Sequence, residues 1–514
     1  MALLMGRTQR PAVQWKPTQF EQGQSVTLPA PYGGLNLRGD VTALGPNEAR
    51  VLDNWVAGAG QLSLRPGFET FGTDLGSGEV KTLAGYFGLS SSKQIAGANG
   101  KLWNVTTGGT ATQLATSFTE DRWVTECYNN RLILVNGTDA PQAYDGSTVT
   151  SAGFTGSGLT ATHLSYVACV QNRMWFCENN SADVWYGGVG AITGALTKFQ
   201  LSQIAAGGTC KAIGSWSRDS GNGPNDYTAF IMSTGEIIIY AGDPSTSFTI
   251  VGKYKGAPPV SKRPLIKVGG EIVIITMLGL LPISAAIGGV NLDLARIDPW
   301  GKIAAGIVTD AKHYGGNVGW HGELHQGFVY VQVPQSAGSL SKLYVLNTRT
   351  GSWSTYSGWN TSAMCSFEND LYFGAQTGGI VNSVTGSSDN GADITATANG
   401  AFSYPAGPAK GCMYTAIRPR FEAQGSVSGI VGVDTDFVIR PIIGSTVEIV
   451  DYPSTTPWGS PWGSPWGVAG QANPQWLTII GNGRSVSVKI KAIGKSPDLK
   501  WYATDVLWKP GSIR

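Results

Sequence analysis

The chain has 514 residues, of which only 14% are charged, and its 36 basic and 34 acidic residues leave a formal net charge of +2. This balance gives no overall attraction to nucleic acid or to an anionic membrane. An apolar content of 42% excludes a disordered chain, and the 71 glycines follow no Gly-x-y period, which excludes a collagen-like fibre. We therefore expect a turn-rich and aromatic-rich, mainly β protein with very little helix.

The first apolar run is too short for a signal peptide, so we expect synthesis in a reducing cytoplasm.

Changes of pattern along the chain predict four regions. The regions are an N-terminal extension (residues 1–27), an N-terminal module (28–79), a β-propeller core with insertions (80–385) and a C-terminal β module with Trp-rich turns (386–514).

The clearest predicted helix covers residues 46–55, inside the N-terminal module. Pro46 suits a first helical turn, and Val51, Leu52 and Trp55 share one helical face.

A repeated pattern runs through residues 80–385. A turn that contains Asn or Gly leads into a short apolar strand, at intervals of about 30 to 60 residues, as in propeller blades. Each hairpin has an apolar face that it cannot bury alone, so we expect the sheets to stack around an axis. A β-sandwich is the alternative for this region. The repeated segments are residues 99–103, 129–135, 171–176, 234–240, 269–274, 326–331 and 368–373.

Residues 272–292 carry no charge and are long enough to span a membrane. Gly279 and Pro282 interrupt the segment, and its start is β-branched, which favours a buried hairpin with strands 271–276 and 280–284. We therefore expect no stable membrane insertion.

The C-terminal module contains three copies of a Trp-Gly repeat, of which the first two continue with Ser-Pro. Proline excludes a regular helix and a central strand here, so a chain of turns that displays Trp458, Trp462 and Trp466 is expected. These indoles are candidates for a subunit interface or for a distal tip that binds glycans. Residues 484–493 predict an edge or half-buried strand, and residues 499–507 predict the last strand.

No motif for catalysis, cofactor or metal is found, so we expect no enzyme. His321, Glu323 and His325 lack the spacing of a zinc-protease helix, and no nucleophile elbow or phosphate-binding loop occurs. The six cysteines form no CxxC pair and are expected to be apolar filler.

One segment of fifteen residues is basic and contains no acid. It is a solvated loop or a contact with phosphates or an acidic partner, because uninterrupted positive charge attracts polyanions. As a site it is a candidate contact with DNA in a channel or with an adaptor protein. Its basic residues are Lys253, Lys255, Lys262, Arg263 and Lys267.

Several motifs, in this order along the chain, resemble the tail nozzle or tail hub proteins of short-tailed bacteriophages, some of which are called tail tubular or packaged-DNA-stabilising proteins. The resemblance covers nearly the whole chain. The motifs are LPAPYGGLNLR (28–38), LGPNEA (44–49), LDNW (52–55), LRPGF (64–68), NGTDAPQ (136–142), YDG (144–146) and WYATDV (501–506).

The resemblance implies a β-propeller core that carries additional β modules, a platform and a nozzle tip. It implies a homo-hexamer in the virion, below the adaptor ring and portal, with tail fibres or tailspikes at the adaptor–nozzle junction. Viral double-stranded DNA would pass through the lumen, which the ring closes before ejection and which then conducts the DNA. The alternative is a propeller-type tail protein that binds or depolymerises host surface glycan.

Overall fold

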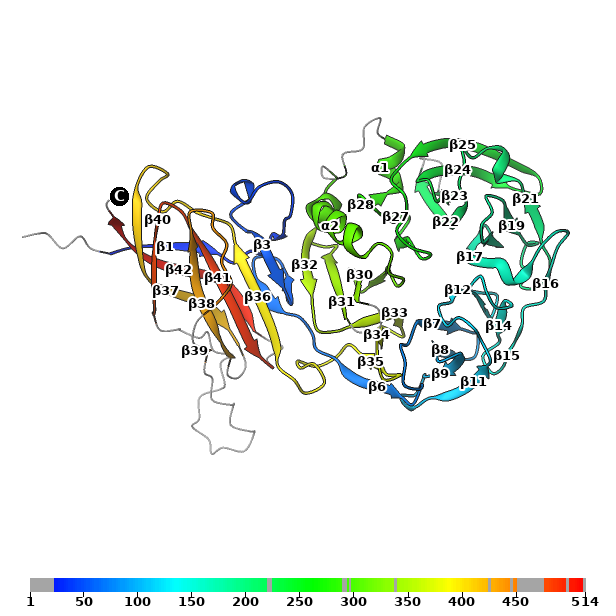
Figure 1. Ribbon diagram of the computed structural model, residues 1–514, viewed down its shortest axis with the longest axis horizontal. Helices are drawn as coiled ribbons and strands as arrows, with labels where there is room; N and C mark the ends of the chain where they lie inside the picture. Colours follow the sequence, from blue (N-terminus) through cyan, green and yellow to red (C-terminus); the bar gives the residue numbers. More distant parts are fainter. Residues whose placement is uncertain are drawn as a thin grey trace, which may run out of the picture.

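Two β-rich bodies lie side by side in the computed structural model, a ring of sheets at the right of Figure 1 and a two-layer sandwich at its left. The structure describes residues 23–219, 224–288, 294, 297–336, 340–423, 427–443, 447–450, 476–495 and 499–511.

The first four blades of the ring each contain four antiparallel strands, which follow one another from the inner to the outer edge. Blade 1 consists of β7 (Thr82–Phe87), β8 (Ser92–Ala98), β9 (Lys101–Asn104) and β11 (Thr112–Thr116), and blade 2 of β12 (Val124–Tyr128), β13 (Arg131–Val135), β14 (Gln142–Tyr144) and β15 (Val149–Ser151). Blade 3 consists of β17 (Leu164–Val170), β18 (Arg173–Glu178), β19 (Val184–Tyr186) and β21 (Thr197–Phe199), and blade 4 of β22 (Cys210–Asp219), β23 (Pro224–Met232), β24 (Glu236–Asp243) and β25 (Ser247–Lys255). A short parallel pair, β16 (Phe154–Thr155) and β20 (Gly194–Ala195), lies beside them.

The last three blades are less regular. Blade 5 consists of β26 (Leu265–Val268), β27 (Glu271–Thr276) and β28 (Gly279–Pro282), and blade 6 of β29 (His321–His325), β30 (Phe328–Ser336), β31 (Leu340–Asn347) and β32 (Ser352–Tyr356). Blade 7 combines β33 (Thr361–Phe367), β34 (Asp370–Ala375) and β35 (Val381–Ser383) with β6 (Glu69–Thr73), on which β10 (Gly109–Thr110) pairs in parallel.

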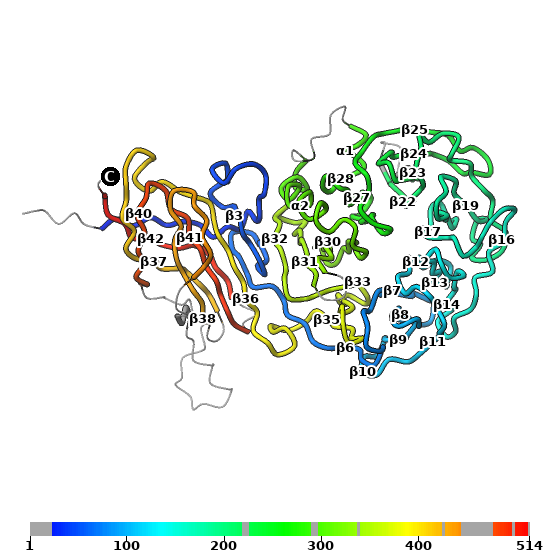
Figure 2. Tube along the Cα trace, in the orientation of Figure 1, coloured from blue at the N-terminus to red at the C-terminus, as the bar shows by residue number. Residues whose placement is uncertain are grey.

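The N-terminal strand β6 closes the ring. It is the outer strand of blade 7, where it pairs antiparallel with β35, and Figure 2 shows these segments from distant parts of the chain together. At the centre, β7, β12, β17 and β22 contact one another in turn, blades 4, 5 and 6 follow, and β33 returns to β7. Among the described residues the ring therefore has seven blades, and the predicted propeller-like core of a mainly β chain with very little helix is confirmed.

The predicted turns lie between neighbouring strands of the blades. Asn129 and Asn130, which join β12 to β13, have φ of 46° and 56°, and Gln326 and Gly327 join β29 to β30 with φ of 46° and 83°. Two consecutive residues with positive φ make the turn whose twist matches that of a β-hairpin. Asparagine and glycine tolerate this conformation best, which explains why at least one of them occurs in the turn that begins each repeat.

The sandwich is assembled from both ends of the chain. One layer contains β1 (Gln24–Pro29), β4 (Trp55–Ala57), β5 (Leu62–Leu64), β37 (Gly411–Glu422), β40 (Leu477–Gly483) and β42 (Lys500–Gly511). The other contains β2 (Gly34–Leu35), β3 (Glu48–Asp53), β36 (Ile394–Gly400), β38 (Val427–Thr435), β39 (Val447–Val450) and β41 (Val486–Gly494). Residues 28–79, which we expected to form their own module, thus share sheets with the C-terminal module and with blade 7.

The second layer continues into the ring, because β3 pairs in parallel with β32 of blade 6 at Asp53 and Thr355. Ten strands therefore belong to one sheet that spans both bodies. Trp55 and Trp501 pack between the two layers with ring centroids 6.1 Å apart, and both are fully buried.

The helix predicted for residues 46–55 is wrong, because this segment forms β3 and β4. Leu52 and Trp55 are buried as the helical pattern required, but Val51 is 38% exposed. Strand β36 supplies antiparallel backbone partners along β3, with a bulge between Ala49 and Val51, and Asn54 with φ of 60° separates the two strands. Tertiary pairing therefore overrides the local periodicity.

The apolar segment after residue 271 begins with the predicted hairpin, since β27 pairs antiparallel with β28. The second strand ends at Pro282 rather than at Ser284, where helix α1 (Ile283–Gly288) has begun; α2 (Ala304–Tyr314) and short 3₁₀ turns over Val41–Ala43, Ala161–His163, Leu201–Gln203 and Trp300–Ile303 are the other helical elements described. None of the helices in the described residues is long and apolar enough to cross a membrane.

Arg65 links the two bodies. Its guanidinium is 1% exposed and binds the Asp389 carboxylate through two hydrogen bonds of 2.6 and 2.8 Å. It also donates to the Asn54 side chain at 2.7 Å and to the Ser357 carbonyl at 3.0 Å, and it lies 5.4 Å from the centre of the Trp359 ring. The LRPGF motif is therefore the buried joint between sandwich and ring.

Candidate functional site

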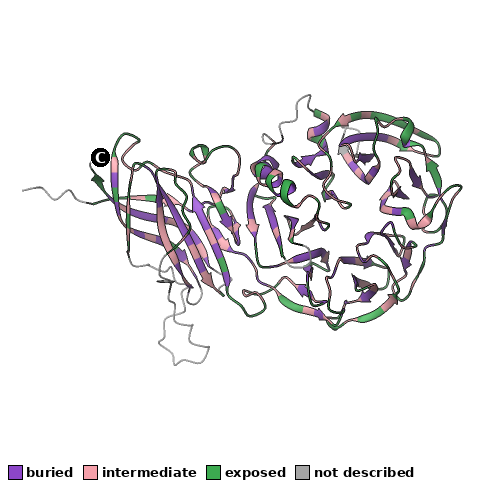
Figure 3. Ribbon diagram, in the orientation of Figure 1, coloured by how far each residue is buried: buried purple, intermediate pink, exposed green. Residues whose placement is uncertain are grey.

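The five basic residues predicted as one cluster are divided by the fold. Lys253 and Lys255 lie on β25, the outer strand of blade 4, where exposed residues predominate (Figure 3). Their ammonium groups donate to the carbonyls of Ile204 at 2.8 Å and of Thr234 at 3.2 Å.

The other three lie near the centre of the ring. Lys262 and Arg263 belong to the loop that leads into β26, the inner strand of blade 5, and Lys267 lies on that strand. The turn between blades 4 and 5 therefore separates residues that are close in sequence.

A pocket of about 230 Å³ opens at this central face. Arg122, Lys211, Lys262 and Arg263 line it, together with residues 315–320. These residues precede or begin the inner strands of blades 2, 4, 5 and 6, so four blades bring them to the same face of the ring. No acidic residue is among those that line the pocket in the described part of the chain.

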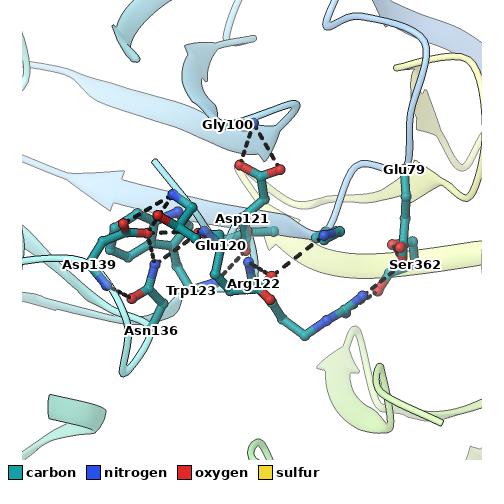
Figure 4. A network of polar contacts seen from close by, with 12 residues as sticks. Glu79, Gly100, Glu120, Asp121, Arg122, Trp123, Asn136, Asp139 and Ser362 are labelled. Atoms are coloured by element: carbon teal, nitrogen blue, oxygen red, sulfur yellow. Dashed lines mark hydrogen bonds and ion pairs between the residues drawn. The ribbon is translucent and has the colours of Figure 1, made fainter. Parts of the chain in front are cut away.

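Arg122 is held from behind the pocket. Its guanidinium forms an ion pair of 2.7 Å with Glu79, and the Ser362 hydroxyl donates to the same carboxylate oxygen at 2.6 Å (Figure 4). The Arg122 side chain is only 10% exposed. Its charge is therefore fixed in place by residues from blades 1 and 7.

The segment that carries Arg122 is itself clamped by the NGTD motif (Figure 4). The Asp139 carboxylate accepts hydrogen bonds from the backbone N–H of Thr119 at 3.0 Å and of Glu120 at 3.1 Å, and Asn136 donates to the Glu120 carbonyl at 2.8 Å. Asp121 accepts from the Gly100 N–H at 2.8 Å. This motif of the resemblance thus joins blade 2 to the segment between blades 1 and 2.

Arg263 faces Arg122 with few partners of its own. One guanidinium nitrogen donates to the Lys81 carbonyl at a long 3.3 Å. Burial, together with the nearby Arg122 charge, lowers the pKa of Arg263 to about 9. Glu79 and Glu323 favour the charged form of Arg263 but do not outweigh these two causes, so its positive charge is only partly compensated.

Two carboxyl groups lie on inner strands of the ring. Burial raises the pKa of Glu126 on β12 to about 7, against the opposing effect of Lys267. Burial likewise raises the pKa of Glu323 on β29 to about 7, although Arg263 and a hydrogen bond from the Ser366 N–H favour the ionised form. Near neutral pH these groups are only partly ionised, so they neutralise the neighbouring cations incompletely.

His321, Glu323 and His325 lie on strand β29, and the two-residue period places them on one face. Each has its own partner on β33: His321 Nε2 accepts from the Met364 N–H at 3.1 Å, and His325 Nδ1 lies 2.8 Å from the Ser366 hydroxyl. Burial lowers the pKa of His321 to about 3, so it is neutral. Among the described residues, no group of three or more His, Cys, Asp and Glu side chains is arranged to hold a metal ion.

All six cysteines are free thiols. Cys177 and Cys210 are buried with their sulfur atoms 3.4 Å apart, between blades 3 and 4. Burial, and the neighbouring Cys210 thiol, raise the pKa of Cys177 well above its usual value, so the Cys177 thiol is unreactive as a nucleophile.

Trp458, Trp462 and Trp466 lie outside the described residues. In the sandwich, an open groove of about 890 Å³ is lined by residues that include Tyr404, Asp436 and Phe437. Asp436 and Phe437 have φ of 53° and 62°. Aspartate and phenylalanine are an unusual pair for the two central positions of a turn in which both residues have positive φ. The Phe437 ring packs on that of Phe402, with centroids 4.8 Å apart.

The pocket and the groove were not predicted from the sequence. Arg122 follows Glu120 and Asp121 just before β12, and Lys211 lies on β22. No local signal distinguishes either of them from other surface cations. The groove is built from four separate segments of the C-terminal module.

No family model and no curated protein matches the sequence. Among solved structures, the chain is similar to BBS1N in its complex with ARL6DN (12% identity, TM-score 0.37, 62% of this chain and 98% of that one). It is also similar to PorZ from Porphyromonas gingivalis (13%, 0.36, 64% and 39%) and to the extracellular domain of the putative one component system BT4673 from B. thetaiotaomicron (10%, 0.42, 85% and 62%). The chain thus spans well under half of PorZ, and TM-scores below 0.5 say nothing about what it binds or does.

Proposed function

We propose that this chain is a structural virion protein, one of six copies that form the tail nozzle of a short-tailed phage below the adaptor and portal. The ring of six closes the DNA channel and then conducts double-stranded DNA during ejection. Tail fibres or tailspikes dock at the adaptor–nozzle junction.

The observation that carries the proposal is exposed apolar surface on the sandwich. Ile443 is 83% exposed and Ile480 is 92% exposed, the latter on the edge strand β40. Tyr404, Met413 and Val438, around the open groove, are each more than 40% exposed. Tyr404 and Met413 line the same groove, and exposed apolar residues that lie together favour contact with another protein. Contacts between copies, or with an adaptor, would bury them.

The two-body architecture is a second support. The sandwich shares a sheet with blade 6, and two motifs of the resemblance lie at structural joints, LRPGF between the bodies and NGTD between blades. Motifs used as joints favour a common scaffold and leave surface loops free to vary.

The test is the mass of the purified protein, alone and mixed with its adaptor ring, combined with images of the mixture. A ring of six copies in either sample is expected. Particles assembled without this protein should leak their genome, and tight particles that retain DNA would contradict the proposal. The five basic residues between 253 and 267 stay candidates for contact with DNA or the adaptor. Glutamate variants of Lys253, Lys255 and Lys262 with unchanged assembly and ejection would remove them.

The glycan-binding alternative has one observation in its favour, the groove where Tyr404 and Phe437 stand beside Asp436 and Arg484. Aromatic faces next to polar side chains suit sugar rings as well as protein partners. Release of reducing ends from host polysaccharide, or a glycan-array signal that Tyr404→Ala removes, would favour this alternative over the nozzle.

A further inference from the structure

We propose that the central pocket of the ring, lined by Arg122, Lys211, Lys262 and Arg263, binds a phosphate group, either as free phosphate or as a small phosphate monoester. This binding site goes beyond the proposed role of the chain in a nozzle and does not depend on it. The steps are the charge of the pocket, the number of free donors, its rigidity and its size.

The charge of the pocket is positive and incompletely balanced. Four cations line it without an acidic residue, and of these Arg122 has Glu79 as an ion-pair partner 2.7 Å away. The ammonium groups of Lys211 and Lys262 form no ion pair or hydrogen bond with any described residue. Cations gathered in a partly buried cleft repel one another, and a bound anion relieves that repulsion.

The donors available match a phosphate group. Arg263 uses one guanidinium nitrogen for a weak hydrogen bond of 3.3 Å to Lys81, which leaves most of its N–H groups free. A guanidinium donates two parallel hydrogen bonds to phosphate, whereas the ammonium groups of Lys211 and Lys262 act as point charges. Arg122 is tied to Glu79 and contributes a fixed positive charge.

Two walls of the pocket are held in place before any ligand binds. The segment with Arg122 is clamped through Asp139 and Asn136, and the far wall, residues 315–320, follows helix α2 directly. Trp320 in that wall is 1% exposed and donates from its indole N–H to the Tyr314 carbonyl at 3.0 Å. A preformed site avoids the entropy of ordering side chains on binding.

The size favours a small ion. The volume of about 230 Å³ is below the usual range of pockets for drug-sized ligands. A phosphate group with a few bound waters fills it, and a monoester can keep its carbon chain at the open face.

The experiment is calorimetric titration of the full chain with inorganic phosphate and, separately, with glycerol phosphate, at pH 7.5 and low salt. We expect one site per chain for at least one of the two anions, with weaker binding as sodium chloride is added. If both bind, a monoester is accepted at the open face; if only inorganic phosphate binds, the ligand is the free ion.

The variants Lys211→Gln and Lys262→Gln should each weaken binding about tenfold, since each removes a charged contact. Arg263→Lys keeps the charge and should also weaken it, because the two-pronged donor is lost. The matched control is the pair Lys253→Gln and Lys255→Gln, with the same chemical change on the outer strand β25. The affinity of these control variants for the anion should stay within about twofold of that of the unaltered chain.

Two results would overturn the proposal. One is that neither anion binds below about 10 mM, which is weaker than any useful site. The other is that the β25 variants weaken binding as much as the pocket variants, which would mean a general effect of net charge. A thermal unfolding curve for each variant separates loss of binding from loss of the fold.

Discussion

Single residues decide how the two bodies of the chain are joined, and Arg65 is the clearest case. Its guanidinium is buried with four different partners, of which Asp389 supplies the balancing charge. Removing one member of a buried ion pair leaves the other charge without compensation. We expect Arg65→Ala to lower the free energy of unfolding by about 3 to 5 kcal/mol, measured by urea denaturation.

The control for Arg65 is Arg38→Ala. Arg38 also forms a short ion pair, 2.6 Å from Asp298, but its side chain is 34% exposed and that of Asp298 is 68% exposed. A solvated pair of this kind contributes about 1 kcal/mol or less. Equal losses for both variants would mean that the joint is not stabilised by the buried ion pair.

Glu323 predicts a specific pH dependence. Its pKa is about 7 in the folded chain because of burial, against an ordinary value of 4.5. The folded state therefore binds the proton more tightly, so this residue's contribution to stability is complete below about pH 4.5 and is lost as the pH rises to about 7. In Glu323→Gln the side chain has no ionisable group, but its amide oxygen still accepts the hydrogen bond from the Ser366 N–H.

The free energy of unfolding of Glu323→Gln, compared with that of the unaltered chain, should therefore increase between about pH 4.5 and 7, and the difference should stay constant above that. Urea denaturation across this range measures the difference. Glu69→Gln, at an exposed position on β6, is the control and should show no such growth. A constant difference at every pH would mean that Glu323 is not held in a buried site.

At the scale of elements, short-range chemistry could be read from the sequence and long-range pairing could not. Asn129 and Asn130 predict their turn because asparagine itself tolerates the left-handed conformation that the turn requires. Strand β6 has no such signal, since its partner β35 lies about three hundred residues further along. Residues 46–55 imitate a helix because their buried positions fit both periods, and only β36 decides between them.

The clamp between blades 1 and 2 is an element-scale prediction. Asp139 accepts hydrogen bonds from the N–H groups of Thr119 and Glu120 and from the Asn136 side chain. Asp139→Ala leaves these donors unsatisfied, and we expect the free energy of unfolding to fall by about 1 to 3 kcal/mol. Hydrogen exchange at Thr119 and Glu120 should accelerate.

Asp145→Ala is the matched control for the clamp. The Asp145 side chain accepts hydrogen bonds only within its own turn, from Ser147 and Thr148, in the described residues. Its loss should leave hydrogen exchange at Thr119 and Glu120 unchanged. If both variants accelerate exchange there, the segment is not held by Asp139 in particular.

At the scale of the whole molecule, the central pocket exists because the blades form a closed ring. Arg122, Lys211 and Lys262 meet because seven blades form a ring, and the ring is complete only when β6 pairs with β35. The repeated turns were enough to predict a propeller-like core. They could not predict which cations share its central face, because that depends on the order and number of blades.

The proposed hexamer makes the last prediction, which compares two exposed apolar residues. Ile480 lies on β40 at the edge of the sandwich and is 92% exposed, and Leu89 lies in the β7–β8 turn of blade 1 and is 93% exposed. Because neither side chain packs in the monomer, Ile480→Asp and Leu89→Asp should each change stability by less than about 0.5 kcal/mol. If copies meet through the sandwich, Ile480→Asp buries a charge in the contact and should abolish assembly of the ring on its adaptor, while Leu89→Asp should assemble normally. Light scattering after size-exclusion chromatography measures the mass of each mixture, and normal assembly of Ile480→Asp would exclude this edge of the sandwich as the contact between copies.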